Sequence, residues 1–200
     1  MKYLLFILFY LSLIFPSNSY SLDNESTSLE WVGSKITGSH NGNVQFSYGE
    51  IILDDKTILS GKLSVDMSTI DNQDISDLKY RGYLVNHLKS EDFFSVDSFP
   101  HAHLTILKHL EVSDEYKKLG FNALVHCELT IKDITHPINI PMVLDVYTNH
   151  AIAKGSINID RTLYNIRYKS KSIFPNIGDK FIYDDFTLNF IIRANRIWEK

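Results

Sequence analysis

The strongest constraint on the fold of this chain is a stretch of twelve residues, 121–132, in which every second side chain is apolar. Such a period of two places alternate side chains on opposite faces of a β-strand, whereas a helix repeats its apolar positions every three to four residues. The stretch therefore predicts a strand with one buried face. That face consists of Phe121, Ala123, Val125, Cys127, Leu129 and Ile131.

The same period recurs along most of the chain. Further runs that follow it lie at 43–49, 61–67, 102–106, 138–146, 157–159 and 186–194. Turn signals such as Asn41-Gly42 and Ser60-Gly61 separate the runs. About eight short strands joined by turns favour an all-β fold, either an antiparallel sandwich or a barrel. The period leaves open whether inward side chains fill the interior or surround a hollow, because they look alike in both cases.

Residues 74–98 interrupt this pattern and predict one helical excursion between strands. Gly82 weakens the predicted helix, and Ser90 is expected to cap a second short turn after it. We expect the excursion to close one side of the sheet. The apolar residues at helical spacing are Ile75, Leu78, Val85 and Leu88.

The N-terminal segment has the layout of a secretory signal peptide, with Lys2 before an apolar run and small polar residues after it. The run spans about 13 residues, fewer than the roughly 20 that cross a bilayer. A retained N-terminal anchor is the alternative. We expect cleavage after Ser19 or Ser21, and a periplasmic or secreted protein that does not span a membrane once mature. The assigned segments are a signal peptide (1–21), a flexible linker (22–28), one domain (29–196) and a tail (197–200).

Neither the composition nor the motifs indicate catalysis. The formal net charge is −4 and no block of Lys and Arg stands out, so nucleic acid is not an expected partner. His101 and His103 share a strand face without a third ligand nearby, so we interpret them as solvent-facing and predict no metal site. Cys127 lies on an apolar face and is interpreted as a core residue. We predict no catalytic residue and no cofactor.

Five motifs follow one another along nearly the whole chain after the signal peptide. They are "WVGSKITGSHNGNVQFSYGEI" (31–51), "GKLSVDMSTID" (61–71), "LVNHLKSEDFFSVDSFPHAHLTI" (84–106), "CELTIKDITHPINIP" (127–141) and "DRTLYNIRYKSKSIFPNIGDKFIYDDFTLNF" (160–190). In this order they resemble the YceI-like, polyisoprenoid-binding family. The sequence departs from the family at positions where glycine is usual, namely Cys127, Asp133, Lys169 and Lys171.

The resemblance implies a lipocalin-like antiparallel barrel of about eight strands with a helix packed at one side. It also implies an exported protein that holds a long isoprenoid or other apolar lipid chain inside the barrel, without a catalytic residue. The adjacent Phe93 and Phe94 of the third motif have a role in this picture. We expect one of them to pack under the helix and the other to border the cavity, with the alternative that both are simply core residues.

The expected ligand is thus a long-chain apolar lipid, bound without a covalent bond. Two alternatives remain: an enzyme of the isomerase or dehydratase type on the same barrel, and a secreted structural domain with a filled core. A homodimer also remains open. The predicted cavity-lining residues are Val44, Phe46, Leu63, Val65, Met67, Leu88, Phe94, Leu104, Val125, Leu129, Phe186 and Leu188.

Overall fold

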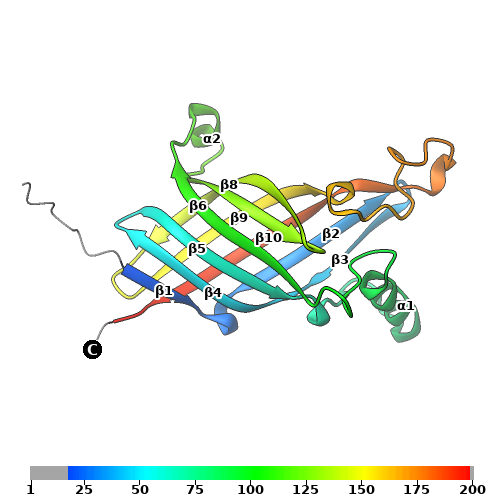
Figure 1. The fold of residues 1–200 in the computed structure, drawn as a ribbon, viewed down its shortest axis with the longest axis horizontal. Coiled ribbons are helices and arrows are strands. Elements are labelled where there is room, and N and C mark those ends of the chain that lie inside the picture. The colour runs from blue at the N-terminus through cyan, green and yellow to red at the C-terminus, as the bar shows by residue number, and fades with distance from the viewer. Residues whose placement is uncertain (1–17, 199–200) are drawn as a thin grey trace, which may run out of the picture.

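The computed structural model describes residues 18–198, which form one antiparallel sheet that curls into a barrel (Figure 1). The hydrogen-bonded order β1-β4-β5-β6-β7-β8-β9-β10 is closed into a ring by pairing of β1 with β10. The strands are β1 (Asn18–Leu22), β2 (Ser28–Lys35), β3 (Gly38–Asn43), β4 (Gln45–Asp54), β5 (Thr57–Asp66), β6 (His101–Leu110), β7 (Ala123–Ile131), β8 (Ile134–Val146), β9 (His150–Asp160) and β10 (Ile182–Arg196).

The two remaining strands, β2 and β3, extend the barrel along its axis and do not add strands to its circumference. β2 follows β1 after a short 3-10 turn, and β3 runs into β4 with only Val44 between them. Along β10, Ile191 is still opposite β2, whereas Ala194 is already opposite β1. Each of the pairs β1–β2 and β3–β4 therefore occupies one position around the wall. The predicted antiparallel barrel of about eight strands is confirmed.

Strand β7 shows why the alternating sequence produces this wall. Ala123, Val125 and Leu129 point inward and are buried, as is Cys127, while Glu128 on the other face is exposed. The neighbouring strands present inward faces of the same kind. The interior of the barrel is therefore surrounded almost entirely by apolar side chains, and their removal from water stabilises the fold.

One glycine is required where the chain leaves β5 and crosses β3. A Cβ atom on Gly42 would lie 2.1 Å from the carbonyl oxygen of Asp71, too close for any side chain. The indole Nε1 of Trp31 donates a hydrogen bond of 3.1 Å to the same carbonyl. This crossing fixes the start of the helical excursion against the wall of the barrel.

The excursion contains helix α1 (Leu78–Lys89), which begins after Asp77, whose carboxylate accepts hydrogen bonds from the backbone of Lys79 and Tyr80. The predicted apolar face is only partly correct. Leu88 is buried, but Leu78 is 77% exposed. The cap predicted at Ser90 is wrong, because its hydroxyl donates to the carbonyl of His87 at the end of α1.

A second short helix, α2 (Asp114–Lys118), connects β6 to β7 and was not expected from the alternating pattern. Ser113 caps it by accepting a hydrogen bond from the backbone of Tyr116. Its five residues are too few to show a helical period of apolar side chains, so only the cap and the two acids after it mark it in the sequence.

The N-terminal assignment needs a correction. Residues 1–17 of the predicted signal peptide lie outside the described residues, but its last four residues belong to β1. The prediction of a flexible linker at 22–28 is also wrong, since Leu22 pairs with Ala194 and a 3-10 turn follows. Tyr20 is 2% exposed. The alternation of Tyr20 and Leu22 was hidden among polar neighbours, yet it is the pattern that inserts β1 into the ring.

Residues 161–181, between β9 and β10, cover a gap in the wall. β8 pairs with β9 only from Val143 to Val146, so the first part of β8 has no partner on that side. The 3-10 turn Arg161–Tyr164 lies over this part, and His136 of β8 contacts the carbonyl of Leu163 through its Nε2 at 3.1 Å. Tyr164 is buried, so the segment completes the enclosure.

Candidate functional site

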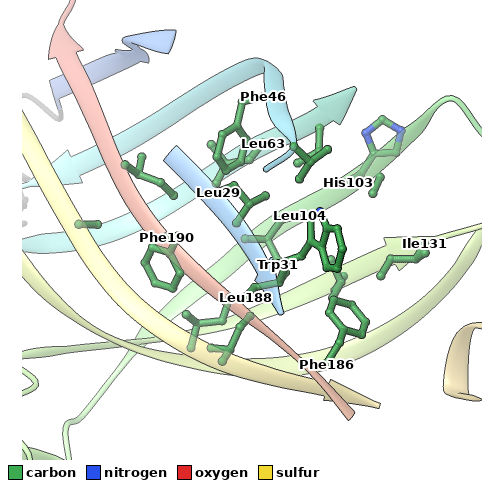
Figure 2. A pocket seen from close by; sticks show the side chains of 18 of the residues that line it. Leu29, Trp31, Phe46, Leu63, His103, Leu104, Ile131, Phe186, Leu188 and Phe190 are labelled. Carbon is green, nitrogen blue, oxygen red and sulfur yellow. The ribbon is translucent and has the colours of Figure 1, made fainter. Parts of the chain in front are cut away.

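The barrel encloses a cavity of about 200 Å³ whose lining residues come from both ends of the wall. Leu29, Trp31, Leu104 and Leu188, from β2, β6 and β10, turn toward this common space (Figure 2). Along β5 and into the 3-10 turn that follows it, the lining runs from Ile58 to Met67, which corresponds to roughly 20 Å along the axis of a tilted strand. A small volume over such a length describes a narrow channel rather than a round pocket.

The structure places every predicted lining residue on the wall of this channel. They come from β4, β5, β6, β7 and β10, from the β3–β4 junction (Val44), from the 3-10 turn after β5 (Met67), from α1 and from the turn after it. For the residues on strands the period of two assigned the inward face, because the wall is continuous and one face of each strand must point inward, whereas Leu88 was predicted from helical spacing and Phe94 from the family resemblance. The residues are Val44, Phe46, Leu63, Val65, Met67, Leu88, Phe94, Leu104, Val125, Leu129, Phe186 and Leu188.

One end of the channel is sealed. At the end that carries the β4–β5 turn, the inward side chains of Tyr20, Leu53, Ile58, Val125 and Ala194 are all at most 3% exposed. These residues come from different strands and pack against one another in the core cluster. Ligand cannot enter between side chains packed in this way without displacing them.

The other end, next to α1, is more open. Here the inward side chains Phe46, Val65, Leu104, Phe186 and Leu188 are only half-buried. These side chains are apolar and point inward, like those at the sealed end. Their greater exposure therefore indicates open space inside the barrel at this end. We therefore place the mouth of the channel at the α1 end of the barrel.

An aromatic cluster supports the mouth from the side of α1. The Phe93 ring lies with its centroid 5.0 Å from that of His87, edge-on at 73°, and 5.7 Å from that of Tyr168, tilted at 48°. Phe94 instead packs edge-on against Phe186 of β10. Both phenylalanines border the channel. The expectation that one packs under the helix and the other borders the cavity therefore holds for Phe94, while Phe93 does both.

A buried guanidinium, which the sequence did not reveal, lies beside this cluster. Arg161 is 3% exposed and donates hydrogen bonds to the carbonyls of Ile166, Ile182 and Tyr183. Its Nη2 also lies 3.4 Å from the carboxylate of Asp184. These bonds join both ends of the 161–181 segment, so Arg161 holds the segment in place at the edge of the mouth.

Burial and neighbouring charges shift the pKa values of Arg161 and Asp184 in opposite directions. Burial lowers the pKa of the Arg161 guanidinium, and the neighbouring carboxylates of Asp184 and Asp160 oppose that effect. Burial raises the pKa of the Asp184 carboxyl, but hydrogen bonds with Ser170 and Ser172 and the charge of Arg161 outweigh it, so its pKa lies below the ordinary value. The pair therefore stays ionised at neutral pH and is neutral as a unit.

The channel offers little polar chemistry. Among its lining residues, His103 and Asp185 are exposed and alternate with the inward Leu104 and Phe186, and Figure 2 shows His103 at the margin of the lumen. Burial raises the pKa of the Cys127 thiol to about 12, so the reactive thiolate is scarce at neutral pH. Within residues 18–198, no group of three metal-ligating side chains comes together. In the same part of the chain, no helix is long and apolar enough to cross a bilayer.

The family model for the YceI-like domain matches residues 20–194, which include the closing strand β1 and nearly all of β10. This chain belongs to the YceI-like family. The match begins at Tyr20, the first buried residue of the YceI-like barrel described above. No curated protein matches the chain.

Solved structures share the YceI-like fold at low sequence identity. BcnA of Burkholderia cenocepacia is 18% identical, with a TM-score of 0.67 over 86% of this chain and 99% of its own. A polyisoprenoid binding domain from Saccharophagus degradans, implicated in plant cell wall breakdown, is 13% identical, with a TM-score of 0.61 over 89% and 98%. The YceI protein of Campylobacter jejuni is 16% identical, with a TM-score of 0.53 over 75% and 79%. At these identities the likeness supports the fold.

Proposed function

We propose that this protein binds the hydrocarbon chain of a lipid, of the polyisoprenoid type, inside its barrel and acts as a carrier or reservoir after export. The observation that carries the proposal is the channel itself, which is apolar along its length, sealed at one end and open at the other. The polyisoprenoid binding domain from Saccharophagus degradans has the same fold, which supports this class of ligand.

The shape of the channel favours one extended chain over a bulky ring system. A volume of about 200 Å³ spread over most of the barrel leaves a slender cross-section. Each CH₂ group removed from water contributes roughly 0.8 kcal/mol, so about a dozen such groups contribute roughly 10 kcal/mol before the costs of association. Affinity would then depend on chain length, because almost all of the lining residues within 18–198 present apolar side chains to the lumen.

The channel also bears on the two alternatives. A structural domain with a filled core has no use for a channel of this kind. An enzyme of the isomerase or dehydratase type requires ionisable side chains that converge on a substrate. Among the described lining residues the buried charged side chain is Arg161, and it is already engaged by backbone carbonyls and Asp184. We therefore propose a binding function without catalysis.

Native mass spectrometry of the purified full-length protein tests the proposal. We expect adducts whose mass corresponds to a long-chain lipid, and the same spectrum shows whether the chain forms a homodimer. A variant that fills the channel, Ala153→Phe, should lose the adduct, since Ala153 lies on its wall. The matched control is Lys154→Phe, one residue further along β9, where the side chain is exposed.

Two further measurements complete this test. A thermal melt followed by circular dichroism establishes that Ala153→Phe remains folded. Wild-type protein without any adduct, and without uptake of added polyprenol, would contradict the proposed function. The proposed export is tested by cell fractionation of the full chain, with the periplasmic or secreted fraction as the expected location.

A further inference from the structure

The wall of the barrel is split between β8 and β9 at the end that carries the mouth. The two strands form only four residue pairs, so residues 134–142 of β8 and 155–160 of β9 have no ladder partner on their facing edges. Both stretches remain paired on their other sides, with β7 and with β10. Pro137 and Pro141 lie in the unpaired part of β8 and carry no backbone N–H, which is typical of a strand edge. The sequence of β8 therefore favours an unpaired edge at this place.

Six residues of the 161–181 segment fill this split. We call residues 161–166 the wedge; they comprise the 3-10 turn Arg161–Tyr164 and the two residues after it. Tyr164 and Ile166 of the wedge are buried. Ile166 lines the channel, as does Ile140 of β8, so the boundary between the wedge and β8 reaches the lumen. We call this boundary the seam.

The wedge is fastened firmly on the side of β9 and β10. It continues directly from β9, and the Asp160 carboxylate accepts hydrogen bonds from the backbone N–H and the hydroxyl of Thr162, at 2.8 and 2.6 Å. The Arg161 guanidinium donates to the carbonyls of Ile182 and Tyr183 at the start of β10. These bonds make the wedge a part of the β9–β10 wall.

On the side of β8 the wedge is held by side chains. The His136 Nε2 lies 3.1 Å from the carbonyl oxygen of Leu163, and the His136 ring meets the Tyr164 ring edge-on. Lys132, in the β7–β8 turn, donates to the carbonyl of Asn165 at 3.5 Å. In the described part of the chain, no backbone hydrogen bond crosses the seam. Opening of the seam therefore separates side-chain contacts and breaks no ladder.

The barrel has a second interruption of its ladder, between β3 and the chain that follows β5. There the backbone N–H of Asp71 donates to the carbonyl of Asn43 at 3.0 Å, and that of Gln73 donates to the carbonyl of Asn41 at 2.9 Å. Backbone hydrogen bonds thus close that gap, whereas side chains close the seam. A backbone ladder parts only when several polar groups lose their partners together, so the seam opens at the lower cost of the two.

We propose that the barrel opens along the seam to admit and release its lipid. This inference rests on the proposed function, because it describes the route of the ligand that the channel holds. The methyl branches of an isoprenoid chain make it wider than a straight hydrocarbon, and the channel has a volume of only about 200 Å³. Paired strands cannot separate to make room without breaking backbone hydrogen bonds. The seam is thus the place where the cross-section of the channel can change.

Cross-linking of the seam tests this proposal. The variant His136→Cys/Leu163→Cys places one thiol on each side of the seam, at positions that contact each other in the wild type, and a short bismaleimide joins them. Burial raises the pKa of the Cys127 thiol to about 12, so the reagent spares it. We expect the cross-linked protein to take up added polyprenol at least about tenfold more slowly than the same variant capped with N-ethylmaleimide. The measurement is the time course of adduct formation in native mass spectrometry.

The matched control joins two positions that do not span the seam. Thr130 and Thr135 face each other across the β7–β8 hairpin, with their hydroxyl oxygens 2.8 Å apart. Thr130→Cys/Thr135→Cys, cross-linked in the same way, should take up polyprenol at the rate of its capped form. Equal slowing in both cross-linked variants would overturn the proposal, because any stiffening of the barrel would then be sufficient.

A second pair of variants loosens the seam instead of locking it. His136→Ala removes the hydrogen bond to Leu163 and the ring contact with Tyr164, and it should speed both uptake and release of polyprenol roughly threefold to tenfold. The control His126→Ala removes a histidine hydrogen bond of the same kind, to Asn139 across the β7–β8 hairpin, away from the seam. It should leave both rates unchanged. Wild-type rates in His136→Ala would contradict a route through the seam.

Failure of the seam proposal is distinguishable from failure of the proposed function. The amount of polyprenol bound at equilibrium reports the channel, whereas the rates of uptake and release report the seam. Wild-type protein that takes up no polyprenol would overturn both proposals. Uptake that is equally fast in the cross-linked and the capped protein would overturn the seam as the route of entry and leave the binding function in place. A thermal melt followed by circular dichroism establishes that each variant is folded.

Discussion

The rings of Phe94 and Phe186 meet edge-on, with centroids 6.5 Å apart and an angle of 87° between their planes. The contact joins the turns after α1 to the first half of β10, across the mouth of the channel. Both rings are half-buried, so the pair narrows the opening without closing it. The adjacent Phe93 is held elsewhere, between His87 and Tyr168. The two adjacent phenylalanines thus have different partners: Phe94 packs on β10, and Phe93 packs between α1 and the 161–181 segment.

Replacement of Phe94 by Ala should widen the mouth and speed the loss of bound lipid. We expect a cost of about 2 kcal/mol in the free energy of unfolding, less than for a fully buried Phe. The measurement is the dissociation rate of a pre-bound polyprenol, followed by native mass spectrometry. The control is Tyr48→Ala, an aromatic residue on β4 that is 51% exposed and outside the channel. Equal lipid retention in the two variants would show that Phe94 does not restrict the mouth.

Arg161 should be among the residues most sensitive to substitution. Its removal leaves the carbonyls of Ile166, Ile182 and Tyr183 without a donor and Asp184 without its partner. We expect Arg161→Ala to lower the free energy of unfolding by about 3 to 5 kcal/mol in urea denaturation. Arg161→Lys should restore little of it, because a lysine cannot reproduce the geometry of several N–H donors.

The comparison for this prediction is Asp184→Asn, which keeps the three carbonyls satisfied and removes one charge. It should cost less than Arg161→Ala. A larger loss for Asp184→Asn would mean that the ion pair, and not the set of backbone hydrogen bonds, holds the 161–181 segment.

The sequence predicted the wall of the barrel better than its ends, and the reason lies in the range of the interactions. Val125 and Leu129 face inward because their strand alternates, which is a local property that can be read in the sequence. Arg161 is buried because carbonyls from Ile166 and β10 converge on it, and no pattern around residue 161 records that convergence. Its charge alone would have placed it at the surface.

Composition misled the prediction at the N-terminus in the same way. Residues 20–28 are polar on average, which is typical of a linker, yet Tyr20 pairs with Ile51 and Arg196 across two neighbouring strands. The partners of β1 lie far away in the sequence, so a short strand with two apolar residues gives almost no local signal. The mouth of the channel escaped prediction for a related reason, because a period of two does not separate packed inward residues from those that border a space.

Asp74 should make stability depend on pH in the acid range. Burial raises the pKa of its carboxyl, but hydrogen bonds from the Asn41 backbone and from His40 and Asn72 outweigh burial, and the pKa falls from 3.8 to about 2. A carboxyl with a lowered pKa in the folded state stabilises the fold above its unfolded pKa. This contribution is lost as the pH falls from about 4 to about 2.

The measurement compares urea midpoints of the wild type and Asp74→Asn across this range. The wild type should be more stable near neutral pH by at most about 1 kcal/mol, because solvent reaches this carboxyl and screens it. The difference should shrink as the pH falls from about 4 and should disappear only below the folded-state pKa of about 2. A difference that stays constant down to that pH would assign the effect to the amide substitution and not to the charge.

If the chain is exported as we propose, the position of β1 predicts where the mature protein begins. Tyr20 is 2% exposed and pairs with Ile51 and Arg196, so a mature chain that lacks it would have a hole at the sealed end of the channel and would lose the strand that joins β4 to β10. Of the two cleavage positions inferred from the sequence, the one after Ser21 is thus incompatible with a closed ring. We expect the intact mass of the protein recovered from the periplasm or medium to include Tyr20. A chain expressed from residue 22 onward should lose lipid binding and several kcal/mol of stability, in line with the removal of a large buried side chain. Unchanged lipid binding by that shortened chain would show that the barrel holds its lipid without β1.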